Sequence, residues 1–309
     1  MRILVTGGAG YIGTALVSQL SMMNDLDEII VYDNLSRRNY NLFIANKFHH
    51  NKLRFIQSDI LDSRRLKKAL EGVDVVYHLA AKVSTPFASD DAHSFEQINH
   101  WGTAELVYAL EENPVKQLIF LSSTSVYGST SELVNEDSPL KSQSFYGISK
   151  VRGEQQVKRL SEQCEVHVIR CGNVYGYNPS MRFEAVINRF VFEAHYNNRI
   201  NIHGSGKQIR AFVHIDSVAE SLVRLIQLSP VGARVPSGTY NLVEQNLSIL
   251  EISSDLKELY PKLEFIFIDQ HMPHRNLQVD TNLKLSNHIG VKPRLVSEQL
   301  KSMKTCLSF

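Results

Sequence analysis

The 309-residue sequence has few cysteines, no long apolar run and no excess of charge of either sign. Its three cysteines (Cys164, Cys171 and Cys306) are odd in number and lack the spacing of zinc ligands or redox motifs, which predicts free thiols in a reducing compartment. The 33 basic and 32 acidic residues leave a net charge of +1, so no global field recruits nucleic acid. No apolar run reaches the roughly 20 residues that span a bilayer, and no signal-length stretch precedes the first strand. We therefore expect a cytoplasmic protein with no nucleic-acid or membrane partner.

An alternation of short strands and longer amphipathic helices fills the first half of the chain. The strand candidates are nearly continuous in Val, Ile and Leu, which is typical of strands that are buried on both faces. We expect strands over 3–6, 28–33, 53–59, 73–80, 117–123 and 165–171, with helices over 12–23, 62–71, 93–112 and 146–163. This order predicts an α/β fold with a doubly wound parallel sheet of the Rossmann type.

The regular alternation of strands and helices ends after Cys171. Helices are expected over 182–198 and 216–228, with a short strand at 200–204. No repeat or flexible linker separates this part from the first half, so we expect a smaller interleaved C-terminal lobe. The predicted division is 1–171 for the Rossmann domain, with a returning segment 209–246, and 172–309 for the second lobe.

Glycines interrupt the chain directly after the first strand. Gly7, Gly10 and Gly13 form a G-x-x-G-x-x-G pattern that opens a helix near Tyr11. The first glycine permits a tight turn, the second lets main-chain N–H groups approach a pyrophosphate, and the third allows close helix packing. Such a turn also serves as a plain strand-to-helix connection, so the pattern alone does not establish a nucleotide site.

A carboxylate at the end of the second strand favours the nucleotide interpretation. Asp33 lies twenty positions after Gly13, where an acidic residue accepts hydrogen bonds from the adenosine ribose and repels a 2′-phosphate. This position predicts NAD rather than NADP as cofactor. Arg37 and Arg38 follow closely and would favour NADP, and we interpret them as solvated loop charges.

Other strand ends carry residues that suit the same site, since open α/β sheets bind ligands at the carboxyl edge. Asp59 ends the third strand, where the alternative role is a helix N-cap with Asp62 as competitor. Ala80 and Ala81 end the fourth strand, where small-residue packing is the alternative.

Tyr146 and Lys150 are candidates for acid–base chemistry. Their spacing of four places a phenol and an ammonium on one face of the expected helix. A nearby positive charge favours phenolate and makes a tyrosine usable as a general base. A serine at the end of the facing strand would orient a substrate hydroxyl and relay its proton. An amphipathic surface helix is the alternative explanation of the pair.

These motifs together resemble the extended short-chain dehydrogenase/reductase family, which includes the nucleotide-sugar epimerases and dehydratases. The resemblance covers essentially the whole chain. The matching motifs are TGGAGYIG (6–13), YDNLS (32–36), SDI (58–60), HLAA (78–81), NHWGT (99–103), SSTSVYG (122–128), YGISK (146–150), RCGNVYG (170–176) and RAFVHIDSVA (210–219).

The resemblance implies roles for individual residues. Ser123, Tyr146 and Lys150 would be catalytic, with Thr124 as a rival for the hydroxyl. Cofactor contacts would fall on Gly7, Gly10, Tyr11, Ile12, Asp33, Asn34, Asp59, Ile60, Leu79, Ala80, Ala81 and Asn99, together with Tyr146 and Lys150. Substrate contacts would fall on Asn173, Arg210 and Arg275. The segment 179–190 is expected to form a helix over the sugar pocket and to add Arg182 and Asn188, although exposed helix polarity explains both residues equally well.

The residues after the catalytic hydroxyl bear on the reaction. By the same resemblance, 4,6-dehydratases carry an Asp-Glu pair where this chain has Thr124-Ser125. We therefore favour an NAD-dependent nucleotide-sugar epimerase that acts at C4 through a 4-keto intermediate. A keto-sugar reductase or a dehydratase of the same family is the alternative, and a non-catalytic NAD(H)-binding regulator is the alternative from another class.

Two further expectations concern metals and assembly. The histidine pairs His49-His50 and His271-x-x-His274 have no third ligand nearby, so no metal is expected. By the resemblance we expect a homodimer formed through the helices 93–112 and 146–163, with Ala104, Leu106, Val107, Ala109 and Leu110 as an apolar face. Burial of that face under the sheet is the alternative.

Overall fold

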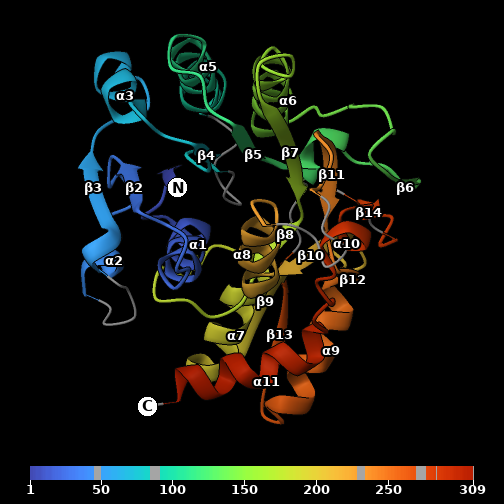
Figure 1. Cartoon of the computed structure of the whole chain (residues 1–309). Coiled ribbons are helices and arrows are strands. Elements are labelled where there is room, and N and C mark those ends of the chain that lie inside the picture. The colour runs from blue at the N-terminus through green and yellow to red at the C-terminus, as the bar shows by residue number, and fades with distance from the viewer. Residues whose placement is uncertain (45–49, 84–90, 228–233, 269–275, 283, 309) are drawn as a thin grey trace.

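The computed structural model describes residues 1–44, 50–83, 91–227, 234–268, 276–282 and 284–308. A central sheet of seven strands, in the order β11-β7-β5-β4-β1-β2-β3, occupies the larger part of the molecule (Figure 1). Every neighbouring pair in it is parallel. The strands are β1 (Arg2–Thr6), β2 (Glu28–Asp33), β3 (Leu53–Gln57), β4 (Val75–His78), β5 (Gln117–Ser123), β7 (Glu165–Cys171) and β11 (Gly238–Leu242). The expected parallel Rossmann sheet is confirmed.

Helices cover both faces of this sheet (Figure 1). One face carries α1 (Tyr11–Ser21) and α8 (Ile215–Arg224), and the other carries α3 (Ser63–Leu70), α5 (Gly102–Glu112) and α6 (Phe145–Lys158). The helical spacing of Leu16, Val17 and Leu20 places all three on the α1 face that packs onto the strands. Because both faces are buried, the strands need no polar alternation, which explains their continuous apolar sequence.

The helix expected over 93–112 is interrupted. It consists of α4 (Ala92–Phe95), a π-helical segment η2 (Glu96–Trp101) and then α5. The predicted apolar dimer face is wrong for Leu106, Val107, Ala109 and Leu110, because these side chains are buried in the core beneath the sheet; Ala104 is half-buried. The packing alternative therefore explains their pattern.

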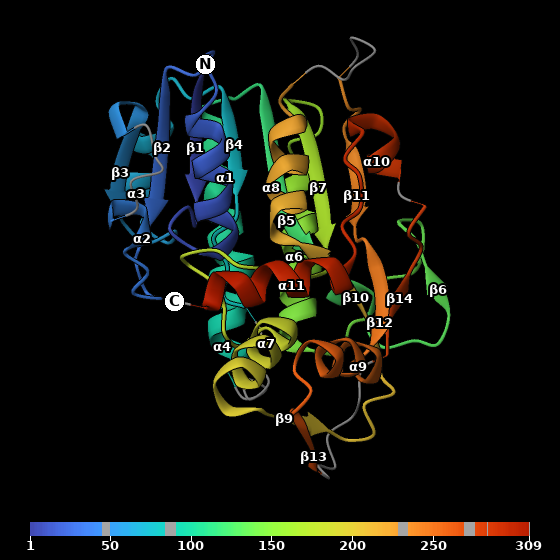
Figure 2. The same cartoon turned by 90° about the horizontal axis from the view of Figure 1, so that it is seen from below.

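The second lobe lies at the carboxyl edge of the sheet (Figure 2). A small sheet of β12 (Gln245–Ser248), β10 (Ile209–His214) and β8 (Asn173–Tyr175) joins it to the large sheet. Its own core packs α7 (Val186–Asn197), α9 (Ile249–Leu259) and α11 (Val296–Leu307) around β9 (Arg199–His203), with which β13 (Glu264–Ile268) pairs. The remaining elements are α2 (Asn41–Ile44), α10 (Lys284–Ile289), the 3₁₀ turns η1 (His50–Lys52) and η3 (Thr124–Tyr127), and the paired strands β6 (Leu133–Val134) and β14 (Gln278–Val279).

The chain between the lobes crosses more than once. After β10 it returns to the large sheet, first as α8 and then as β11, which pairs with β7. The expected helix 182–198 begins only at Val186, because the chain before it is held in turns by bonds to other segments. Across the described ranges, none of the helices has the length and apolar character required to cross a membrane.

Candidate active site

The glycine-rich turn between β1 and α1 is a backbone surface from which side chains are excluded. Gly7 has φ +70°, and a Cβ atom there would lie 2.6 Å from the backbone nitrogen of Ala80 at the end of β4. A Cβ at Gly13 would overlap the carbonyl oxygen of Gly7. The first turn of α1 adds main-chain N–H groups with partial positive charge. A narrow loop at a positive helix end fits a dinucleotide pyrophosphate.

Asp33 lies beside this loop at the end of β2. Its Oδ2 accepts a hydrogen bond from the Ala9 N–H at 3.1 Å, and its Oδ1 accepts one from the Leu35 N–H at 2.8 Å. Burial raises the pKa of the Asp33 carboxyl, whereas these two backbone bonds lower it. The carboxylate is therefore fixed in direction by the backbone, as a group that reads ribose hydroxyls must be.

The neighbouring strand end continues the same polar edge. The Asn34 amide donates to Asp59 Oδ2 at 2.8 Å, and Asp59 Oδ1 accepts the Leu61 N–H at 3.0 Å. The side chain that caps α3 is Asp62, which accepts the Arg65 N–H at 3.1 Å. The Asp59 carboxylate does not cap α3, and its hydrogen bonds connect the residues that follow β2 and β3 at the sheet edge.

The apolar candidates at this edge have packing contacts. Ile60 is buried against the start of α5, where a Cβ at Gly102 would meet its side chain at 2.6 Å. Ile12 is half-buried between the cores of the two lobes. Leu79 and Ala80 hydrogen-bond Thr6 through their N–H groups, and Ala81 follows them along the same edge. These contacts close the β4 end against the glycine turn.

The predicted catalytic hydroxyl and phenol come together. Ser123 ends β5 and caps η3, where its Oγ accepts the Ser125 N–H at 3.2 Å. Burial raises the pKa of the Tyr146 phenol, and the Ser123 hydrogen bond and then the Arg182 guanidinium lower it. Thr124, the rival for this position, is buried. Ser123 is therefore the hydroxyl that acts on the phenol.

Lys150 lies one helical turn beyond Tyr146 and is only 3% exposed. Its Nζ donates to the Leu121 carbonyl at 2.8 Å and lies 4.9 Å from the centre of the Phe120 ring. Burial lowers the pKa of the Lys150 ammonium to about 8, although the Glu154 carboxylate opposes that shift. An amine with this pKa carries its proton near neutral pH but releases it easily. Its direct action on the phenol stays a prediction.

A buried ion pair fixes α6 against the sheet. Arg170 on β7 donates to both carboxylate oxygens of Glu154, at 3.0 and 2.8 Å, and the Ser122 hydroxyl donates to Glu154 at 2.6 Å. Removal of one partner of such a pair leaves an uncompensated charge in the core. The pair therefore sets the depth at which α6 carries its catalytic face. No motif in the sequence assigned a role to either residue.

Asn99 positions the opposite side of α6. It is buried in η2, where its Oδ1 accepts the Lys82 N–H at 2.8 Å and its Nδ2 donates to the Lys82 carbonyl and the Ser149 hydroxyl, both at 2.9 Å. The extra residue of the π-helical turn aims this amide inward. Asn99 thus joins the chain after β4 to the helix that carries Tyr146.

The model of a known family matches residues 3–242 of the chain, under the description "NAD dependent epimerase/dehydratase family". The chain belongs to this family. The sequence-based resemblance is thereby confirmed, and NAD is confirmed as the cofactor on which the family depends.

Similar proteins of this family include enzymes of two kinds. The dTDP-D-glucose 4,6-dehydratase of Homo sapiens is 32% identical over 269 residues, which cover 84% of this chain and 73% of that protein. A UDP-glucuronic acid 4-epimerase from Bacillus cereus, solved with UDP-glucuronic acid and NAD, superposes with a TM-score of 0.85 at 26% identity and covers 99% of this chain and 98% of that one. A dTDP-glucose 4,6-dehydratase from Streptomyces venezuelae gives 0.84 at 26%, covering 99% and 96%. The family is therefore certain, whereas these likenesses do not separate epimerase from dehydratase.

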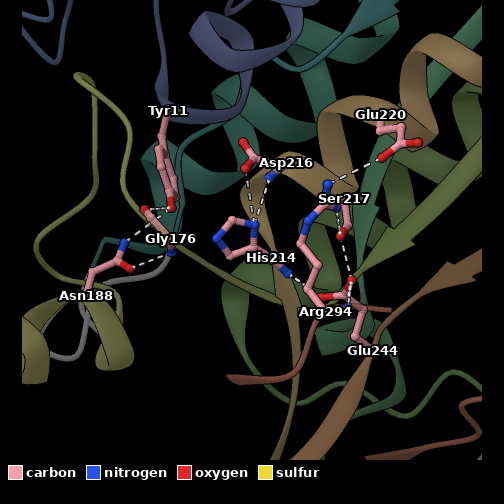
Figure 3. Close-up of polar contacts among 9 residues, drawn as sticks. All are labelled: Tyr11, Gly176, Asn188, His214, Asp216, Ser217, Glu220, Glu244 and Arg294. Carbon is pink, nitrogen blue, oxygen red and sulfur yellow. Dashed lines mark hydrogen bonds and ion pairs between the residues drawn. The ribbon is translucent and has the colours of Figure 1, made fainter. Parts of the chain in front are cut away.

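Residues of the second lobe are tied to the glycine turn (Figure 3). The Tyr11 hydroxyl donates to the Gly176 carbonyl at 2.5 Å, so this side chain points toward the second lobe. Asn188 is fully buried, accepts the Gly176 N–H at 3.0 Å and donates to the Arg182 carbonyl at 3.0 Å. Both Asn188 side-chain atoms are thus used to hold the turn that presents Arg182.

A second polar cluster in Figure 3 anchors the C-terminal segment. The Glu244 carboxylate accepts three hydrogen bonds. They come from the His214 N–H at 2.7 Å, the Ser217 hydroxyl at 2.5 Å and the Arg294 N–H at 2.8 Å. The Arg294 guanidinium also donates to Ser217 and lies 3.5 Å from Glu220. This cluster holds the chain that enters α11 against the start of α8.

The remaining substrate candidates lie in the small sheet or outside the described residues. Asn173 is exposed on β8 and donates to the Ala211 carbonyl at 2.9 Å. Arg210 lies on β10, two positions before the strand pairs with β8. Arg275 falls outside the described residues, as do His49, His271 and His274. Within the part of the chain that the structure describes, no group of three metal-binding side chains gathers.

Proposed function

We propose that this protein is an NAD-dependent nucleotide-sugar epimerase that inverts C4 through a 4-keto intermediate. The supporting observation is the end of β5, where Ser123 hydrogen-bonds the Tyr146 phenol and is followed by Thr124-Ser125, with no acid at either position. By the family resemblance, a dehydratase would carry an Asp-Glu pair at these two positions. A site with one hydroxyl and one phenol suits oxidation and reduction at a single carbon.

We assign each proton step of this reaction to a residue of the chain. Ser123 orients the C4 hydroxyl of the sugar, and ionised Tyr146 takes its proton. The cofactor, when bound, would supply the hydride acceptor in its oxidised form and the hydride donor of the return step in its reduced form. Tyr146 then returns the proton to the C4 oxygen after the keto sugar has turned over in the pocket. Positive charge from Lys150 and Arg182 favours the ionised phenol in the first step.

We assign NAD to the carboxyl edge described above. Gly7 and Gly10 bring backbone to the pyrophosphate, and Asp33 accepts from the adenosine ribose. Asn99 acts by holding the chain around Lys82, and Tyr11 by fixing the turn to Gly176. The further cofactor contacts proposed are Ile12, Asn34, Asp59, Ile60, Leu79, Ala80 and Ala81.

The second lobe is proposed to hold the nucleotide diphosphate. Asn173, Arg182, Arg210 and Arg275 are the proposed contacts, since arginine forks suit phosphate oxygens. Asn188 is proposed to act indirectly, because its polar atoms are occupied by Gly176 and Arg182. Binding remote from the reacting carbon leaves the sugar free to turn.

A 4,6-dehydratase is the second candidate, and it is favoured by the 32% identity to the human dTDP-D-glucose 4,6-dehydratase. The test is incubation of the purified protein with UDP-, GDP-, dTDP-, CDP- and ADP-hexoses while anomeric NMR signals are followed. A C4 epimer formed without added reductant is the expected result. Accumulation of a 4-keto-6-deoxy sugar would establish the dehydratase instead, and turnover that consumes stoichiometric NADPH would establish a reductase.

We also propose that the protein is a cytoplasmic homodimer that associates through the outer faces of α5 and α6. Tyr108 on α5 is 48% exposed, and Trp101, which ends η2 directly before α5, is 50% exposed. The Arg159 guanidinium lies 5.1 Å from the Tyr108 ring centre. Exposed aromatic residues with an arginine are typical of interface centres. Light scattering after gel filtration tests the dimer. The proposed compartment rests on the three free cysteines.

A further inference from the structure

An ion pair joins the loop after β2 to the second lobe. The Arg37 guanidinium lies 2.6 Å from the Glu184 carboxylate, and the two residues are 147 positions apart in the sequence. Both side chains are 39% exposed. Arg37 is thus exposed on its loop, and its guanidinium is in addition paired with a carboxylate from the other lobe.

The segment that carries Glu184 is held against the cofactor half at several points. The Asn41 amide donates to the Pro179 carbonyl at 2.7 Å, and the Thr14 hydroxyl donates to Ser180 Oγ at 3.0 Å. These bonds come from α2, which directly follows the loop of Arg37, and from α1. The position of Glu184 is thus built into the contact between the lobes.

Glu184 also lies within electrostatic reach of a second guanidinium. Burial lowers the pKa of Arg182, and Arg37 lowers it further, whereas Glu184 raises it. Arg37, Arg182 and Glu184 therefore interact electrostatically, and Glu184 carries the negative charge among these three. Its charge compensates both arginines.

The loop that holds Arg37 begins at Asp33, the group proposed to read the adenosine ribose. NADP differs from NAD by a phosphate on the 2′-oxygen of that ribose, and a nearby arginine is the usual partner of this phosphate. An arginine already bound to a carboxylate offers less to a phosphate, and the carboxylate itself repels the dianion.

We infer that Glu184 is a determinant of NAD selectivity, which it enforces by occupying Arg37 and by opposing a 2′-phosphate. This inference rests on the proposed function, in which Asp33 marks the ribose site. Selectivity is then set from two lobes at once. Asp33 favours the ribose hydroxyls, and Glu184 removes the arginine that a 2′-phosphate would use.

The size of the effect follows from the exposure of the pair. An exposed ion pair changes an equilibrium by about fivefold at most. Loss of the carboxylate also removes its repulsion of the phosphate across solvent, which is of similar or smaller size. We therefore expect Glu184→Gln to shift the ratio of NADP⁺ to NAD⁺ affinity about five- to tenfold toward NADP⁺.

The experiment measures Kd for NAD⁺ and NADP⁺ by calorimetry on the full-length protein. Glu184→Gln should tighten NADP⁺ binding with little change for NAD⁺. The double variant Glu184→Gln with Arg37→Met should lose the part of that gain that comes from the released guanidinium and keep only the part that comes from the lost repulsion. Glu165→Gln is the matched control, because its carboxylate is 38% exposed and pairs with Arg234 at the opposite edge of the sheet. This control should leave the ratio unchanged.

The outcomes distinguish a failure of the Glu184 role from a failure of the proposed ribose site at Asp33. An unchanged ratio in Glu184→Gln, or a gain that survives Arg37→Met in full, overturns the role of Glu184. Asp33→Ala is measured in parallel. If it weakens NAD⁺ while Glu184→Gln changes nothing, the proposed ribose site stands and only the inference fails. If wild-type protein binds neither dinucleotide, both fail.

Discussion

The hydrogen bond from Tyr11 to Gly176 offers a direct test of how the two lobes are held together. In Tyr11→Phe the Gly176 carbonyl loses its buried donor, and the Asn188 amide loses a weaker contact at 3.5 Å. A buried acceptor left unpaired costs about 1–3 kcal/mol. Because the aromatic ring stays, no cavity adds to this cost. We expect the free energy of unfolding to fall by about 1–3 kcal/mol.

Tyr11→Phe should also lower kcat/KM. The lost bond connects the first residue of α1, beside the glycine turn, to the segment that leads to Arg182. If the arrangement of the two lobes is weakened by about 1.4 kcal/mol, kcat/KM falls about tenfold. A loss of this size is expected with the nucleotide sugar as the varied substrate.

Tyr77→Phe provides a matched control. Tyr77 is fully buried in β4, and its hydroxyl donates to the Leu222 carbonyl at 2.9 Å, within the Rossmann half. Urea unfolding followed by circular dichroism should show a similar loss of stability in both variants. Only Tyr11→Phe should reduce kcat/KM at a temperature where both remain folded.

Two results would refute this reasoning. If Tyr11→Phe unfolds within about 0.5 kcal/mol of wild type, the Gly176 carbonyl does not depend on the hydroxyl. If both variants reduce kcat/KM equally, the effect reports general loosening of the fold and not the contact between lobes.

Three other predictions concern the reacting groups. Tyr146→Phe should keep NAD⁺ binding in calorimetry and lower kcat at least ~10²-fold, and unchanged turnover would remove the general base from the mechanism. Asp33→Ala should weaken NAD⁺ and reduce its advantage over NADP⁺, so an unaltered ratio would move the ribose site elsewhere. The pKa of Lys150 is lowered to about 8, below its unfolded value, so the unfolded chain binds more protons above pH 8 and stability rises from there to about pH 10. Urea unfolding should show that rise in wild type relative to Lys150→Met, and parallel curves would contradict it.

The sequence predicted the parallel sheet well because its strands are buried on both faces and their apolar runs are unmistakable. It predicted equally well that Ser123 and Tyr146 meet, since a strand end and a helix start converge at the carboxyl edge. It did not predict the π-helical turn of residues 96–101, because no residue type marks such a single turn inside a longer helix.

Contacts between distant segments were beyond sequence reasoning. Glu154 with Arg170, and Arg37 with Glu184, are pairs of ordinary charged residues whose partners are fixed only by the topology. Asn188 was expected either to contact the substrate or to be an exposed polar residue of the helix, yet it is fully buried because the preceding turn folds back onto Tyr11. The hydrophobic periodicity of a sequence indicates which face of a helix is apolar. It does not indicate which polar groups of a neighbouring loop contact that helix.

The late return of β11 to the large sheet has a consequence for how the protein can be cut. Without residues 238–242, β7 would become an edge strand with its buried residues Val168 and Ile169 beside an open row of peptide groups. The face beneath would also lose α8, whose Val218 and Leu222 pack there. A fragment that stops at Cys171 should therefore aggregate on expression, even though every glycine and acid of its nucleotide edge is present. The division at Cys171 between the proposed cofactor half and the second lobe is therefore not a division between independently folding units.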